Sequence, residues 1–161
     1  MKKELLYVVA IIAGVILATG ILFGFENFSG DTTFEVNIGD TYFVIPKIYL
    51  LLLFMLLLTV FAWFVRILFT RFEIKYANYI FLFFNTLLMI YLILICKYLG
   101  DFNEILREGL SETTSREMAT SMNKVIANFL YSAYFAIVLS VFIEIVVIFK
   151  TRKLHQNTTE I

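Results

Sequence analysis

The residue best suited to chemistry in this chain is Glu144, an acidic side chain inside a long apolar run near the C-terminus. A carboxylate within a membrane span is costly, so such a residue is a functional candidate by default, for example in a proton relay. Lys150 follows six positions later, which is about 9 Å along a helix. We therefore expect Glu144 to lie near the headgroups on the basic side of a membrane, in a structural ion pair with Arg66 or Arg71. The proton relay is the alternative.

A ridge of small and polar residues leads up to Glu144 at four-residue spacing: Asn128, Ser132, Ala136 and Ser140. Because an α-helix has 3.6 residues per turn, each step drifts by about 40° and the ridge winds around the helix. Such a ridge favours hydrogen bonds to a neighbouring helix. It could alternatively line a transport path in an oligomer, but a path needs an opposing polar lining. We expect packing to be its role.

The composition is that of a membrane protein. Hydrophobic residues make up 61% of the 161 positions, whereas soluble domains are roughly 45–50% apolar. The 13 basic and 13 acidic residues balance, which argues against a nucleic-acid partner. With one cysteine, Cys96, no internal disulfide can form, and the one histidine, His155, lies in a polar tail. We therefore expect no metal site and no cofactor in this chain alone.

Four long runs without Asp, Glu, Lys or Arg predict an all-α protein with four transmembrane helices. We place the helices at about residues 5–25, 47–68, 76–98 and 124–149, within one domain that covers residues 1–161. Each run reaches the roughly 17–25 residues that a helix needs to cross the hydrocarbon layer. The first run is longer than the core of a signal peptide, about 7–15 residues, so we expect it to remain as a helix.

The charges near the ends of these runs predict the orientation. Basic residues fall on one side: Lys2, Lys3, Arg66, Arg71, Lys75, Lys150, Arg152 and Lys153. The two longer loops on the other side have an excess of acidic residues. By the positive-inside rule, both termini lie in the cytoplasm and the protein spans the inner membrane of the cell.

Each of the two outer loops is expected to contain a short element. The segment TTFEVNIGDTYFVI alternates around Gly39 and Asp40, which predicts a β-hairpin with glycine in its turn. In the second loop, Asp101 precedes Glu104 by three residues, as in a capping box, and this predicts a short surface helix.

The stretch DTYFVI at residues 40–45 resembles a motif of subunit I of the haem-copper (cytochrome c and quinol) oxidases. That family carries H-D-T-Y-[YF]-V-[VI]-A-H-x-H at the outer end of its tenth helix. The surroundings agree in order, because a helix and an outer loop precede the motif and two further helices follow it. The resemblance would cover almost the whole chain, as the last four helices of the family.

The departures from this motif concern its metal ligands. Gly39, Lys47 and Tyr49 stand where the family has its three histidines, and Pro46 replaces the alanine. An ammonium cannot ligate haem unless it is deprotonated, and a tyrosinate ligand is rare. The resemblance therefore implies a version of the site without ligands, and Asp40 is expected to cap the hairpin turn.

Three classes of function remain open. We expect a non-catalytic membrane protein, an accessory or scaffold subunit related to oxidase subunit I, with the lipid bilayer and a larger membrane complex as partners. The alternative is a small oligomeric transporter or channel that uses the ridge and Glu144. An enzyme at the membrane surface has the weakest support, because no nucleophile–base pair is apparent. Small residues in the first helix, Ala10, Gly14 and Ala18, indicate either a seam between copies of the chain or internal packing.

Overall fold

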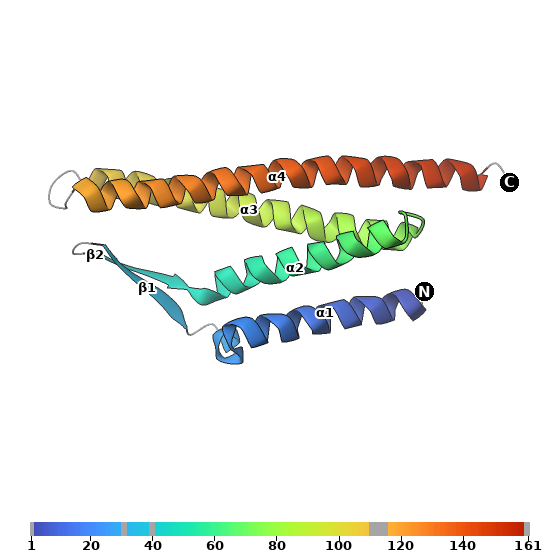
Figure 1. The fold of residues 1–161 in the computed structure, drawn as a ribbon, viewed down its shortest axis with the longest axis horizontal. Helices are drawn as coiled ribbons and strands as arrows, with labels where there is room; N and C mark the ends of the chain where they lie inside the picture. Colours follow the sequence, from blue (N-terminus) through green and yellow to red (C-terminus); the bar gives the residue numbers. More distant parts are fainter. Residues whose placement is uncertain (1, 30–31, 39–40, 110–115, 160–161) are drawn as a thin grey trace. The chain divides into compact units, whose positions relative to one another are not determined.

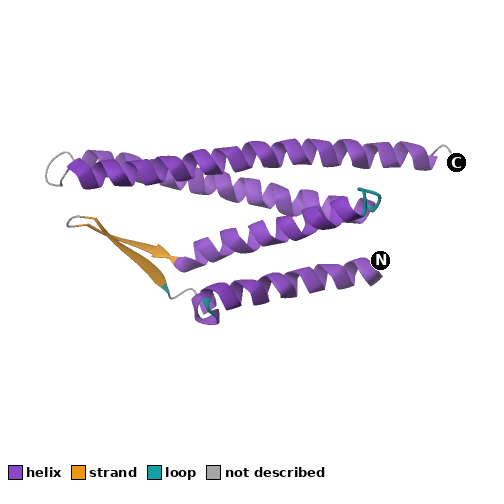
Figure 2. Cartoon of the chain, in the orientation of Figure 1, coloured by secondary structure: helices purple, strands orange, loops and turns teal. Residues whose placement is uncertain are grey.

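The computed structural model describes residues 2–29, 32–38, 41–109 and 116–159. The order of elements is α1 (Lys2–Phe23), η1 (Phe25–Ser29), β1 (Thr33–Ile38), β2 (Thr41–Pro46), α2 (Lys47–Phe69), α3 (Lys75–Gly109) and α4 (Arg116–Thr159) (Figures 1 and 2). The chain divides into two compact units, one of Met1–Leu88 with Glu144–Ile161 and one of Met89–Ile143. The single domain stays a prediction.

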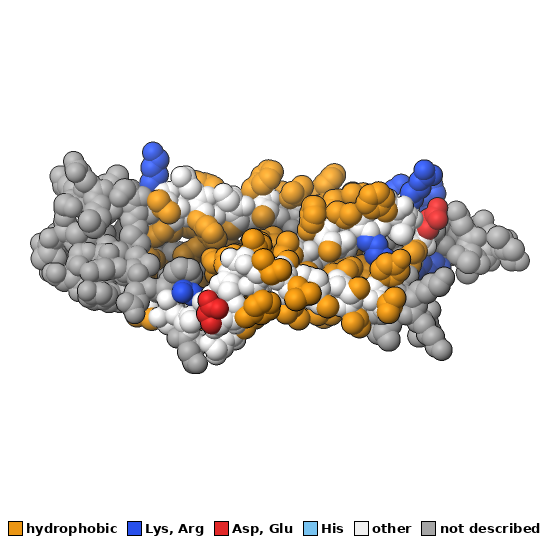
Figure 3. All heavy atoms as spheres, turned by 60° about the horizontal axis from the view of Figure 1, so that its bottom comes forward, with side chains coloured by type: hydrophobic (Ala, Val, Ile, Leu, Met, Phe, Trp, Pro, Cys, Tyr) orange, Lys and Arg blue, Asp and Glu red, His pale blue; other side chains and the backbone are white. Residues whose placement is uncertain are grey.

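The four predicted transmembrane helices are confirmed. In the described part of the chain, four helices are long and apolar enough to cross a membrane: Leu6–Phe23, Lys47–Phe69, Lys75–Glu104 and Asn123–Lys153. Figure 3 shows hydrophobic side chains covering much of the visible surface, with few charged side chains among them. Exposed apolar side chains of this kind require an apolar solvent, so the protein is a multi-pass membrane protein.

The segment for which the sequence predicts a hairpin contains β1 and β2, which pair in antiparallel register. Thr33 lies opposite Pro46, and Ile38 lies opposite Thr41. Gly39 and Asp40 lie outside the described residues, so the capping role of Asp40 stays a prediction. Pro46 has φ −60° and ψ 126° and is the residue before α2. Proline is tolerated there because the start of a helix does not use its missing N–H.

The separate surface helix predicted for the second outer loop is wrong. Asp101 and Glu104 continue α3, which runs without a break to Gly109, and α4 begins at Arg116. Extending an existing helix adds one hydrogen bond per residue, whereas a new helix needs a costly nucleus. Charged residues end an apolar span, but they do not end a helix. For the same reason α4 continues past residue 149, to Thr159.

Two ring contacts show that α1 and α2 pack antiparallel. Near the end of α1, the Phe23 ring lies 5.0 Å from the Phe54 ring. At the other end, the Arg66 guanidinium carbon lies 3.9 Å from the centre of the Tyr7 ring. Gly14 of the small-residue stripe of α1 is not part of this packing, because a Cβ added to it would meet nothing within 4 Å.

The turn between α2 and α3 is tight and left-handed. Arg71 and Phe72 both have positive φ, 50° and 65°, a conformation that costs roughly 1–2 kcal/mol for a residue with a Cβ. The Phe72 N–H donates to the Ile67 carbonyl at 2.9 Å. The turn belongs to the unit of Met1–Leu88 with Glu144–Ile161. In the core of this unit, Trp63, Ile67 and Phe81 are fully buried.

A threonine in each helix donates its hydroxyl to the carbonyl four residues earlier. The distances are 2.7 Å for Thr19 to Val15, 2.8 Å for Thr59 to Met55, 2.9 Å for Thr86 to Leu82 and 2.7 Å for Thr151 to Val147. These hydroxyls are satisfied within their own helix, as is common for threonine in apolar surroundings.

Candidate functional site

The side-chain amide of Asn78 joins three elements near the basic end of α3. Its exposed fraction is 0%. Nδ2 donates to the Phe72 carbonyl in the turn before α3 at 2.9 Å and to the Thr151 hydroxyl of α4 at 3.0 Å. The Thr151 hydroxyl uses its own hydrogen for the Val147 carbonyl, so it is a true acceptor here. One amide group therefore holds the left-handed turn, α3 and α4 together.

The buried polar atoms of this unit that lack a hydrogen-bond partner among the described residues include Oδ1 of Asn78 and Nε1 of Trp63. The core that contains these atoms also contains the buried side chains of Ile67 and Phe81, and an unpaired polar atom in such surroundings costs free energy. The orientation of the Asn78 amide is nevertheless determined, because both groups that face Nδ2 act as acceptors.

Glu144 of α4 lies against Thr86 of α3. The Thr86 hydroxyl is 2.8 Å from Oε1 of Glu144 and 2.9 Å from the Leu82 carbonyl oxygen. A hydroxyl group carries one hydrogen, so it divides that hydrogen between the two acceptors. Glu144 as a whole residue is half-buried. This contact is the second polar link between α3 and α4.

The two links fix the register of α3 against α4 in this unit. Eight residues separate Asn78 from Thr86, and seven separate Glu144 from Thr151, which gives about 12 Å and 10 Å of antiparallel helix. Thr86 lies eleven residues from the nearest charged residue on either side, Lys75 or Lys97. That is about 16 Å in each direction.

Glu144 therefore lies opposite the middle of the uncharged run of α3. The expectation that Glu144 lies near the headgroups rests on its distance from Lys150 along α4. The contact with Thr86 fixes which part of α3 Glu144 faces, and its depth in the membrane stays a prediction.

The two arginines proposed as partners of Glu144 lie in different surroundings. The guanidinium carbon of Arg66 is 3.9 Å from the centre of the Tyr7 ring and 5.0 Å from that of Trp63, distances typical of cation–π contacts. Arg71 is exposed in the turn after α2. The contact that the structure gives Glu144 is the Thr86 hydroxyl, and an ion pair with either arginine stays a prediction.

The ridge along α4 passes from exposed to buried positions, as a winding ridge does. Asn128 and Ser132 are exposed, and Ser140 is buried. The Ser132 hydroxyl donates to the Asn128 carbonyl at 2.9 Å, so it is satisfied within α4.

The positions that the oxidase resemblance assigns to haem ligands lie at the start of α2. Lys47 lines a hollow of about 110 Å³ together with Phe23, Asn27, Leu50 and Leu51. Tyr49 is exposed. In the described residues, no group of three or more His, Cys, Asp or Glu side chains is arranged to hold a metal ion.

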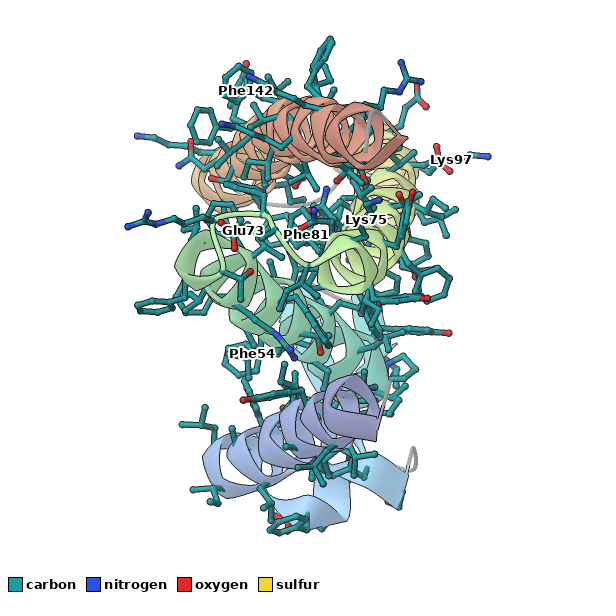
Figure 4. The ribbon with its side chains drawn as sticks, turned by 90° about the vertical axis from the view of Figure 1, so that its right-hand side faces the viewer. Phe54, Glu73, Lys75, Phe81, Lys97 and Phe142 are labelled. Atoms are coloured by element: carbon teal, nitrogen blue, oxygen red, sulfur yellow. The ribbon has the colours of Figure 1, made fainter. Side chains whose placement is uncertain are left out.

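Sequence reasoning missed Asn78 and Thr151, which make a buried polar link between α3 and α4. The available signal was an amide within an uncharged run, because such a group needs a partner in an apolar environment. Thr151 gave no signal, since it stands between Lys150 and Arg152 and looks like part of a polar tail. Figure 4 shows Glu73 and Lys75 beside the turn that this link holds, and Phe81 directed inward.

We predict that Asn78 and Thr151 are energetically coupled. In a double-mutant cycle of Asn78→Ala and Thr151→Val, the interaction should be about 0.6 kcal/mol, the average for hydrogen bonds between membrane helices, and at most about 1.7 kcal/mol. The measurement is the free energy of unfolding in mixed detergent micelles. Asn78→Ala with Thr59→Val is the control, because the Thr59 hydroxyl bonds to its own helix, and this pair should be additive. Additivity in both cycles would contradict the link.

Comparison with known proteins gave no match: no family model matches the chain, and neither a curated protein nor a solved structure is similar to it. The resemblance to oxidase subunit I therefore stays a prediction. The geometry of the described residues is the basis for the function proposed below.

Proposed function

We propose that this protein is a non-catalytic, multi-pass membrane protein that acts as an accessory or scaffold subunit of a larger membrane complex. The observation that carries the proposal is how the polar groups within its apolar helices are used. Asn78 and Thr86 are each hydrogen-bonded to α4, and a threonine hydroxyl in each helix bonds to its own backbone. Polar groups that join helices stabilise a fixed arrangement, which is what a scaffold needs.

A relation to the C-terminal helices of oxidase subunit I is part of this proposal. It is supported by residues 40–45 and by their place directly before a membrane helix, since α2 begins at Lys47. In such a relative the outer end of α2 would serve as a membrane anchor. The exposed ring of Tyr49 suits that role, because tyrosine favours the membrane–water interface.

We further propose that both termini face the cytoplasm, in the inner membrane. Support comes from the unit that contains α1 and α2. The antiparallel packing of these helices puts the start of α1 and the turn after α2 at one end. The bond from Asn78 to Thr151 brings the basic run at residues 150–153 to that turn. Three basic segments thus share one end, as the positive-inside rule requires.

The topology predicts which positions an impermeant thiol reagent can reach. In a background with Cys96→Ala, we expect Ser29→Cys and Asp101→Cys to react in intact cells, because both residues are exposed on the proposed outer side. Lys153→Cys, also exposed, should react only after the membrane is opened. Labelling of Lys153→Cys in intact cells would show that the orientation is the opposite of the one proposed.

One observation favours a second candidate, a small transporter or channel. The contact with Thr86 puts the Glu144 carboxyl group opposite the middle of the apolar run of α3. Acidic residues at such depth are rare and often take part in ion or proton pathways. An opposing polar lining is still needed, and α2 offers the Thr59 hydroxyl, which is already bonded to the Met55 carbonyl.

Glu144→Gln distinguishes the two candidates. The amide oxygen of glutamine can still accept the Thr86 hydrogen bond, so we expect wild-type stability and no change in proton or ion flux across reconstituted vesicles. Thr86→Val is the matched control, since it removes the donor and should destabilise by about 1 kcal/mol. A folded Glu144→Gln protein that has lost a flux present in the wild type would establish the transporter instead.

The scaffold proposal predicts stable partners. Affinity purification of the full chain in a mild detergent should recover a larger membrane complex in fixed ratio, identified by mass spectrometry. A tagged, unrelated four-span protein expressed at the same level is the control. Recovery of the chain alone, from membranes in which it is folded, would count against an accessory role.

A further inference from the structure

Five basic side chains form a patch at the end of the unit that holds the Asn78 link. We call it the basic patch; its members are Arg71, Lys75, Lys150, Arg152 and Lys153. Among the described side chains of residues 70–75 and 150–153, Glu73 is the one acid. The two segments are far apart in sequence, and the bond from Asn78 to Thr151 holds them side by side.

The geometry of α4 explains why its basic residues face outward. Thr151 turns inward to Asn78, and its exposed fraction is 6%. Successive residues of an α-helix are 100° apart, so the neighbours of an inward residue point away from the core. Lys150, Arg152 and Lys153 are all exposed, as is Arg71 on the turn. The Asn78 link therefore gathers the basic side chains of the two segments at one end of the unit.

Apolar side chains border the basic patch. Phe69, at the end of α2, is 85% exposed, and Phe149, beside Lys150, is 68% exposed; Tyr76 beside Lys75 is exposed as well. A soluble anion or a nucleic acid would not bind these apolar side chains, because it has no hydrocarbon tail. A molecule with a negatively charged head and a hydrocarbon tail matches both parts of the surface.

We propose that the basic patch is a binding surface for anionic phospholipids, with the headgroup phosphate on the Arg and Lys side chains and the acyl chains along Phe69 and Phe149. Clusters of four to eight basic residues next to a membrane helix bind anionic lipids through their charge. Arginine adds paired hydrogen bonds to phosphate oxygens. The proposal rests on the membrane placement given above, but not on a scaffold role, so the partner experiment can fail while lipid binding holds.

Thermal unfolding of the full chain tests the proposal. The protein is purified in a neutral detergent, and unfolding is followed by the fluorescence of Trp63, the one tryptophan. A ligand that binds the folded state raises the melting temperature. Phosphatidylglycerol should raise it in a saturable manner, whereas phosphatidylcholine and inorganic phosphate should not. High salt should weaken the effect, because it screens exposed charges.

Neutralising the patch should remove the selectivity. Each basic side chain near a membrane surface contributes about fivefold in affinity, so Arg71→Gln with Arg152→Gln and Lys153→Gln should weaken phosphatidylglycerol binding about 100-fold. Lys97→Gln with Lys124→Gln is the matched control. These two lysines are exposed but lie outside the patch, and the affinity should stay within twofold of wild type.

Single variants keep the test decisive where the triple variant does not fold. Arg152→Gln alone should weaken binding about fivefold, measured by retention of phosphatidylglycerol in native mass spectrometry. Equal stabilisation by phosphatidylglycerol and phosphatidylcholine would overturn the proposal. So would wild-type affinity in the triple variant, or an equal effect of inorganic phosphate, since either would show that the patch does not recognise the lipid.

Discussion

The constraint on which this structure depends is that a polar group inside an apolar region must find its partner within the protein. The Nδ2 group of Asn78 meets it with two bonds, one to the turn after α2 and one to α4. These bonds set where α4 lies along α3. The placement of Glu144 opposite Thr86, and of residues 150–153 beside the turn, follows from that register.

The same amide offsets the strain of the turn before α3. Two consecutive residues with positive φ, Arg71 and Phe72, cost roughly 1–2 kcal/mol each. The Phe72 residue is held on both sides of its backbone: its N–H bonds to Ile67, and its carbonyl bonds to Asn78. The Asn78 side chain is fully buried, and a hydrogen bond is stronger in such surroundings than in water, so it can hold a conformation that would be rare in a flexible loop.

The helices could be predicted from the sequence, but their ends and contacts could not. Uncharged runs located all four spans, because a membrane imposes a minimum length. They did not locate the ends of α3 and α4, since charged residues such as Glu104 and Arg116 are good helix formers outside the membrane. Glu144 was found as a candidate, but its contact with Thr86 depends on helix register, which local sequence does not contain.

The threonine hydroxyls bear on how the protein is made. Each helix carries one that is hydrogen-bonded to its own backbone. This hydroxyl therefore adds little to the free-energy cost of moving a single helix from the translocon into the bilayer. Asn78 is different, because one of the two hydrogen bonds of its Nδ2 group needs the Thr151 hydroxyl as the acceptor. During synthesis α3 enters the bilayer before that residue exists. The helix translated after α3 is thus the one that completes the hydrogen bonding of the Asn78 Nδ2 group.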